Sequence, residues 1–199
     1  MISNICKIDN GTADLAPIMT ECEKVAVYNE LTHKQSLQLR LICEEIDGML
    51  PNIIGDFKGE LWIEVLDKVC RVNVSLTLDE YTSDIKEELI GISKDKKNAS
   101  AVGIVGKIRS ALESFFLDAR LQRAFDVSSS NLFGAGECPD CGDYAYRWSL
   151  DEYRSFAEKS CGSESWDELE KSVIASVADD VIVGVKGKHA DIIITKNFK

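Results

Sequence analysis

This sequence predicts an α/β protein of the α+β kind, a two-layer sandwich in which helices cover one face of an antiparallel or mixed sheet. Two stretches predict that class. Residues 70–78, CRVNVSLTL, alternate apolar and polar side chains without a fault, which is typical of a half-buried antiparallel strand. Residues 36–50 instead repeat apolar side chains at helical spacing, so this helix has one buried face.

The chain divides at changes of composition and at turn-forming residues. Its 199 residues favour one domain, or one and a half. Prolines and glycines mark the ends of several predicted elements. The predicted parts are an irregular arm at 1–20, a core at 21–125, a loop or linker excursion at 126–164, and a C-terminal helix plus hairpin at 165–199.

The core begins with two predicted helices, a short one at 21–31 and a longer one at 36–50. Two strands follow, ELWIEVL at 60–66 and CRVNVSLTL at 70–78. Only DKV separates them, so they are predicted to form a hairpin. The loop that precedes the first strand is marked by Pro51, Gly55 and Gly59.

A charged segment and a long helix complete the core. YTSDIKEELIGISKDKKNAS combines a short helix with a polar loop. The long helix is predicted over 101–125, AVGIVGKIRSALESFFLDARLQRAF, and has two glycines near its start. Residues 126–147 are rich in Ser, Gly and Asp, which predicts the excursion.

The last helix is predicted from its N-cap. In SWDELEKSVIASVA, Ser165 and Glu168 have the spacing of a capping box, in which each side chain accepts a backbone N–H of the first turn. VIVGV and ADIIITK then predict a hairpin that turns near Gly187. The predicted buried stripe of the helix consists of Trp166, Leu169, Val173 and Val177.

The C-terminal part, 165–199, is expected to pack against the core or against a second protomer, and not to form a free tail. An isolated hairpin is marginal in water, and its strands are apolar on one face. Docking within the chain would extend the sheet, whereas docking across a dimer would pair exposed strand edges. The order helix, strand, strand also echoes 36–78, so an internal duplication is a further interpretation, although no residue-level match supports it.

The helix at 36–50 carries three carboxylates beside its apolar stripe. On a helical wheel Glu44 points nearly opposite the stripe, whereas Glu45 and Asp47 lie on its two borders. A border carboxylate can face a cleft while the helix stays packed. A solvated face and a functional site therefore both remain open. The stripe itself is Leu39, Ile42, Cys43, Ile46, Met49 and Leu50.

The run from Leu39 through ELWIEVLDKVCRVNVSLTL to AVGIVGKIRSALE resembles the ATP-binding domain of the histidine-kinase and gyrase superfamily, and within it the anti-sigma-factor serine kinases. The resemblance covers roughly residues 20–120 and implies a Bergerat-like fold and ATP as ligand. SKDKKNASA matches the position of the family's mobile lid. The resemblance implies that Glu45 is the catalytic glutamate and that the nucleotide is bound by Asp79, Gly103, Gly106 and Lys107.

Two departures from the family pattern bear on chemistry. The family holds magnesium with an Asn four residues after its Glu, but Met49 stands there, and a thioether is a poor ligand for a hard cation. The family's Asp-x-Gly-x-Gly box is also missing, because DEYTSD after the strand contains no glycine. The resemblance then implies an ATP-binding protein with doubtful magnesium binding and a weakened or lost catalytic site. The alternative is a non-catalytic regulatory or protein-interaction module that retains the fold.

The composition of the chain limits the classes of partner that the protein is expected to bind. The formal net charge of −11 argues against nucleic acid and against anionic membranes, both of which require basic surface. No stretch of 18 consecutive apolar residues predicts a membrane span, and the N-terminal residues lack the pattern of a signal peptide. Seven cysteines, several within apolar patterns, favour a reduced cytoplasmic setting. A protein partner or a homodimer remains possible.

CPDC is the other motif whose residue types are typical of metal or redox sites. Cys138 and Cys141 form half a zinc site, which Cys161 and His189 would have to complete. A redox pair would need a helix N-terminus, whereas FGAGECPDCGDYAY predicts a turn, so unliganded thiols in a loop are the third interpretation. His33 and His189 are expected to be solvent-exposed.

Overall fold

The computed structural model describes residues 1–9, 15–53, 57–77, 108, 112, 146–160, 172–186 and 189–198. The predicted lid, Leu78, CPDC, the capping box and most of the helix at 101–125 lie outside them. Along the chain the elements are β1 (Cys6–Asp9), α1 (Ala16–Tyr28), α2 (His33–Ile53), β2 (Lys58–Leu66), β3 (Val69–Thr77), β4 (Tyr146–Ser149), α5 (Leu150–Ser160), α7 (Val173–Val177), β5 (Asp180–Lys186) and β6 (His189–Asn197).

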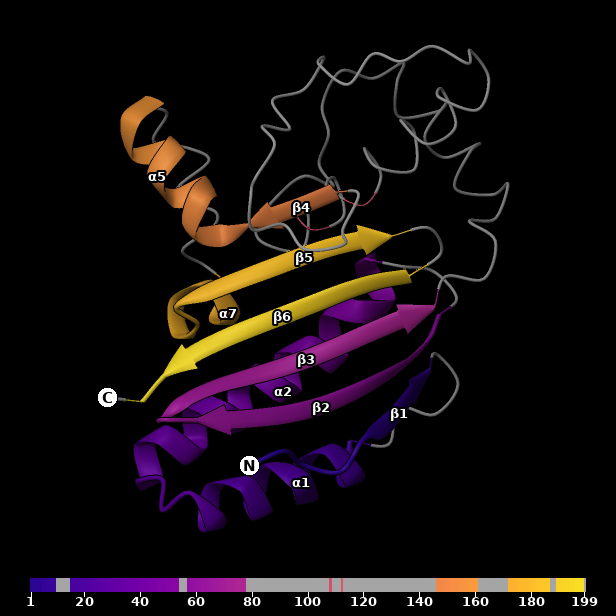
Figure 1. The fold of residues 1–199 in the computed structure, drawn as a ribbon, viewed down its shortest axis with the longest axis vertical. Coiled ribbons are helices and arrows are strands. Elements are labelled where there is room, and N and C mark those ends of the chain that lie inside the picture. The colour runs from indigo at the N-terminus through magenta and orange to yellow at the C-terminus, as the bar shows by residue number, and fades with distance from the viewer. Residues whose placement is uncertain are drawn as a thin grey trace.

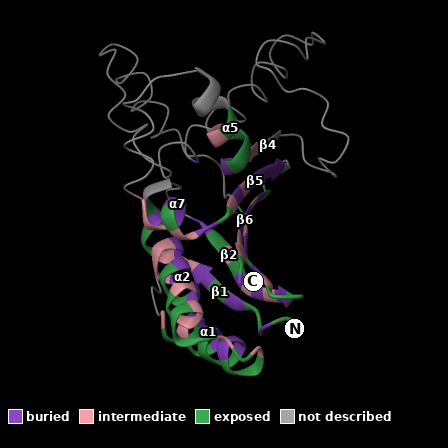
Figure 2. Ribbon diagram, turned by 90° about the vertical axis from the view of Figure 1, so that its left-hand side faces the viewer, coloured by how far each residue is buried: buried purple, intermediate pink, exposed green. Residues whose placement is uncertain are grey.

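The described strands form one six-stranded sheet in the order β1-β2-β3-β6-β5-β4, and each neighbouring pair is antiparallel. Helices α1, α2 and α7 lie on one face of this sheet (Figures 1 and 2). The predicted α+β class is therefore confirmed, with an antiparallel sheet. Within the described residues, no helix is both long enough and apolar enough to cross a bilayer.

The β2–β3 hairpin confirms the prediction made from alternation. Leu66 pairs with Val69, and the two turn residues, Asp67 and Lys68, have φ values of 50° and 66°, as a two-residue hairpin turn requires. Asn73 departs from the pattern, because it is buried on the opposite face of the strand. The inward residues are buried as predicted: Cys70, Val72, Val74 and Leu76.

Helix α2 is longer than the predicted 36–50 and contains Pro51 in its last turn. The predicted loop at Pro51–Gly59 is thus partly wrong. A proline this close to a helix end removes one hydrogen bond, to the carbonyl of Asp47, and only two residues follow it in α2. Gly59 lies inside β2 and opposite Ile8 of β1. A side chain does not fit there, because a Cβ would lie 2.6 Å from the carbonyl oxygen of Ser75.

The prediction of an irregular arm at 1–20 is wrong. Residues Cys6–Asp9 form the edge strand β1 on β2, and Ser3 extends this contact by donating its N–H to the carbonyl of Ile63. Helix α1 begins at Ala16, with Pro17 in its first turn, and not at 21. A strand of four residues gives too few alternations to be predicted from sequence.

The C-terminal part docks within its own chain. β6 pairs with β3 over nine residues, and β5 pairs with β6 as the predicted hairpin. β4 and α5 occupy part of 126–164, which was predicted to be a loop or linker. In α7 the fully packed residues are Ile174 and Ala175, whereas Val173 and Val177 of the predicted stripe are only half-buried.

The described elements repeat one order, strand, helix, helix, strand, strand, in the two halves of the chain. The strand order of the sheet is also symmetric about the β3–β6 pair, whose central residues are Asn73 and Ile193. β3 and β6 have equal length and start 120 positions apart, at Val69 and His189. Buried aliphatic residues recur at the same offset, Leu61, Ile63, Val65, Val72 and Val74 matching Val181, Val183, Val185, Ile192 and Ile194.

Two glycines provide a matched test of this packing. Gly59→Ala is expected to destabilise the protein by about 1–3 kcal/mol, because the new Cβ would meet the backbone oxygen of Ser75 and the side chain of Leu76. Gly48→Ala, with nothing within 4 Å of the new Cβ, should stabilise α2 by about 0.5–1 kcal/mol. Urea unfolding of both variants measures the difference. Equal effects of the two changes would contradict the pairing of Gly59 in β2 with Leu76 in β3.

Glu21 predicts a stability that depends on pH. Its carboxylate accepts hydrogen bonds from Lys24 and from the side chain and backbone of Asn4, and these bonds lower its pKa from 4.5 to about 2. The stabilisation is complete above pH 4.5 and is lost as the pH falls toward 2. Glu21→Gln should therefore lower the free energy of unfolding at neutral pH and converge with wild type in acid. The exposed neighbour Glu23, changed to Gln, should show no such convergence.

Candidate functional site

The site predicted on α2 is built around the borders of its buried stripe. All six predicted stripe residues are buried, so the wheel orientation of the helix is confirmed. Glu45 and Asp47 are half-buried on the two borders. Glu44 faces away from the stripe and accepts a hydrogen bond from Arg40 at 2.8 Å. One helix therefore carries one paired carboxylate and two border carboxylates.

The border carboxylates have no hydrogen bond or ion pair to any residue in the described part of the chain. Burial alone raises the pKa of Asp47, and no cation or N–H group offsets that effect. A half-buried carboxylate without a partner destabilises the folded state. Such a cost is typical of groups retained for binding or catalysis, and here it marks the α2 border as the candidate site.

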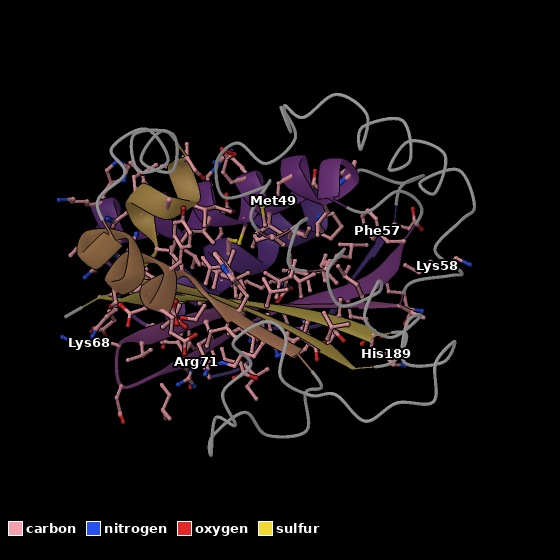
Figure 3. The ribbon with its side chains drawn as sticks, turned by 90° about the horizontal axis from the view of Figure 1, so that it is seen from above. Met49, Phe57, Lys58, Lys68, Arg71 and His189 are labelled. Carbon is pink, nitrogen blue, oxygen red and sulfur yellow. The ribbon has the colours of Figure 1, made fainter. Side chains whose placement is uncertain are left out.

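Met49 lies on the buried stripe, 5% exposed, and Figure 3 places its sulfur on the helix side of the sheet. Its thioether packs with the core and offers no oxygen to a hard cation. The residues present here therefore do not fit a magnesium ion held as in the resembling family. Among the described residues, no group of three or more His, Cys, Asp or Glu is arranged to hold a metal.

One end of the sheet lies next to the C-terminal end of α2. There Lys58, Thr77 and His189 pair across β2, β3 and β6, and the Thr77 hydroxyl lies 3.5 Å from Nδ1 of His189. Figure 3 shows Lys58 and His189 together at this end. His189 is exposed, as predicted, and so is His33, the first residue of α2.

Three of the residues predicted to bind the nucleotide, Gly103, Gly106 and Lys107, lie outside the described part of the chain. Asp79 lies outside it as well. The residues that follow them are informative. Ile108 and Leu112, which follow Lys107 in the sequence, are both helical and fully buried in the core. The structure thus brings the Glu45 helix to the core together with the residues that follow Gly106 and Lys107.

A cysteine cluster was missed by sequence reasoning. Cys22 of α1 and Cys43 of α2 bring their sulfurs to 3.1 Å, and Cys6 and Cys70 are buried in the same core. All four are free. The available signal was a cysteine on the apolar stripe of each of two successive helices, which predicts thiols at a helix–helix contact.

Comparison with known proteins gave no match to a family model, to a curated protein or to a solved structure. A functional assignment therefore depends on the residues of this chain.

Asp47→Asn tests whether the border carboxylate destabilises the fold. Because the folded pKa of Asp47 is raised, its ionisation disfavours the native state once the pH exceeds 3.8, and the penalty is complete above the folded pKa. The variant should be more stable than wild type at pH 7, and the gain should shrink toward pH 3. Glu44→Gln is the control and should show no gain, since it removes a paired carboxylate. Chemical denaturation across this pH range measures both.

Proposed function

We propose that this protein binds ATP as a cytoplasmic, Bergerat-like relative of the histidine-kinase type ATP-binding domains, with a weakened catalytic site. Glu45 is the catalytic glutamate, and Asp79, Gly103, Gly106 and Lys107 hold the nucleotide. The proposal is supported by the packing of the Glu45 helix on one face of the sheet that contains β3, the strand that ends two residues before Asp79 (Figure 2).

The observation that carries this proposal is the pair of unpartnered, half-buried carboxylates on α2. The surface carboxylate Glu44 has an arginine partner, so the lack of partners is specific to the border positions. Glu45 can accept a hydrogen bond from the attacking water or hydroxyl group, which is the role of a general base. Asp47, with a pKa raised by burial, adds a second polar group on the opposite border of the same helix.

The weakness of the site follows from Met49. Phosphoryl transfer depends on a metal that neutralises the charge developing on the phosphate oxygens. A buried thioether four residues after Glu45 supplies no oxygen for that metal. Binding without efficient turnover is therefore the proposed activity.

A second candidate is a protein-interaction module, either with another protein or as a homodimer. Large apolar side chains are exposed on α1, on the first half of α2, on the N-terminal segment and at the end of β2, which favours a protein interface over an isolated surface. These are Ile2, Ile5, Val27, Tyr28, Leu37, Leu41 and Leu66.

Calorimetric titration of the full chain with ATP tests the proposal. We expect weak binding whose affinity changes by less than about threefold when magnesium is removed, because no metal ligand replaces the missing Asn. Lys107→Ala should weaken binding several-fold by removing a phosphate partner. Lys34→Ala, an exposed lysine at the start of α2, is the charge-matched control and should bind as wild type does.

Two outcomes would overturn parts of this proposal. Tight, magnesium-dependent binding with steady ATP turnover would show that Met49 does not mark the metal position. An absence of binding heat at millimolar ATP would exclude the nucleotide site and leave the interaction module as the supported function.

A further inference from the structure

We propose that Cys22 and Cys43 are a redox pair, which a peroxide oxidises to a disulfide that ties α1 to α2. This proposal does not depend on nucleotide binding. Each cysteine comes from one of two consecutive helices that pack side by side and are joined by a short connection (Figure 1).

The geometry of the two thiols carries this proposal. Their sulfurs are 3.1 Å apart and share a hydrogen bond, and both residues belong to the buried core. A disulfide requires a sulfur separation of about 2 Å, so a shift of roughly 1 Å along the same direction completes the bond. Side-chain rotation and small helix movements supply shifts of that size.

The neighbouring cysteines differ from the pair in their surroundings. Burial raises the pKa of Cys70 to about 12, so it remains a thiol. Cys6 lines a surface pocket of about 440 Å³ together with Asn4, Pro17 and Glu21. We place the entry of a small neutral oxidant at this pocket, beside Cys6 and beside Glu21, the residue that precedes Cys22.

The order of events follows from the same contacts. Hydrogen bonding to Cys22 and then burial raise the pKa of Cys43 well above its ordinary value, so Cys22, the slightly more exposed sulfur, reacts first. Its thiolate attacks the peroxide, an S–O bond forms, the O–O bond breaks, and one water leaves. The Cys43 sulfur then attacks the sulfenic sulfur, the S–O bond breaks, and a second water leaves. Two thiols and one hydrogen peroxide thus give one disulfide and two waters.

The structural effect would be a covalent α1–α2 link adjacent to the candidate site. Cys43 precedes Glu45 by two residues on α2, so the link would fix the helix that carries the border carboxylates. A disulfide between Cys22 and Cys43 would restrict the unfolded chain and would therefore raise the stability of the folded protein. The expected rise in melting temperature on oxidation is on the order of 5 °C.

Peptide mapping of the full chain tests the proposal directly. After brief exposure to hydrogen peroxide and alkylation of the remaining thiols, mass spectrometry should recover a Cys22–Cys43 cross-linked peptide that disappears on reduction. Cys43→Ser should lose both this peptide and the oxidant-induced rise in melting temperature. Cys70→Ser, which changes a similarly buried cysteine of the same cluster, should retain both.

Peptide mapping of the oxidised wild-type protein tests the proposal even if a variant folds poorly. Recovery of Cys22 and Cys43 as alkylated thiols, after other cysteines have been oxidised, would overturn the proposal. A cross-link from Cys22 to Cys6 or Cys70 in place of Cys43 would overturn it as well. No nucleotide is present in this experiment, so its failure is independent of the ATP titration.

Discussion

The pairing of β3 with β6 is the constraint on which the rest of the fold depends. It runs for nine residues through the centre of the sheet and joins chain segments 120 positions apart. Without it each half would be a three-stranded sheet with an exposed apolar edge. The entropic cost of closing so long a loop grows only slowly with its length.

The parts of the fold that could be predicted from sequence are those whose pattern is complete within one element. Residues 70–78 alternate over a whole strand, and β3 was predicted within one residue at each end. β1 was missed because only Cys6 and Ile8 face inward, and β4 with α5 was missed because the composition of 126–164 is polar. The border positions of Glu45 and Asp47 followed from the wheel alone. Their lack of partners required the tertiary structure.

In the proposed function, helix α2 both packs on the sheet and carries binding groups, and these two roles restrict each other. Its stripe is fixed by contact with the sheet, so chemistry is possible only at the borders and on the outer face. Met49 illustrates this restriction, because a position that would have to face a metal instead fills the core. Asp47 shows the opposite case, in which a polar border group is retained although burial disfavours its charge. A weak binding site is the expected result of that compromise.

Helix α1 connects the sheet edge to α2 through groups that respond to solution conditions. Glu21 holds the N-terminal segment through Asn4, and the next residue, Cys22, contacts Cys43. In the centre of the sheet, by contrast, the contact between β3 and β6 is aliphatic where Val72 and Val74 lie opposite Ile194 and Ile192, and Cys70 lies opposite Lys196 nearer one end. Acid would therefore weaken the contacts of α1 before those within the sheet. The proposed oxidation of Cys22 and Cys43 would instead strengthen the contact between α1 and α2. Besides Asp47 on α2 itself, α1 is thus a described element through which pH can act on the helix that carries the candidate site, and the proposed Cys22–Cys43 link would add redox state.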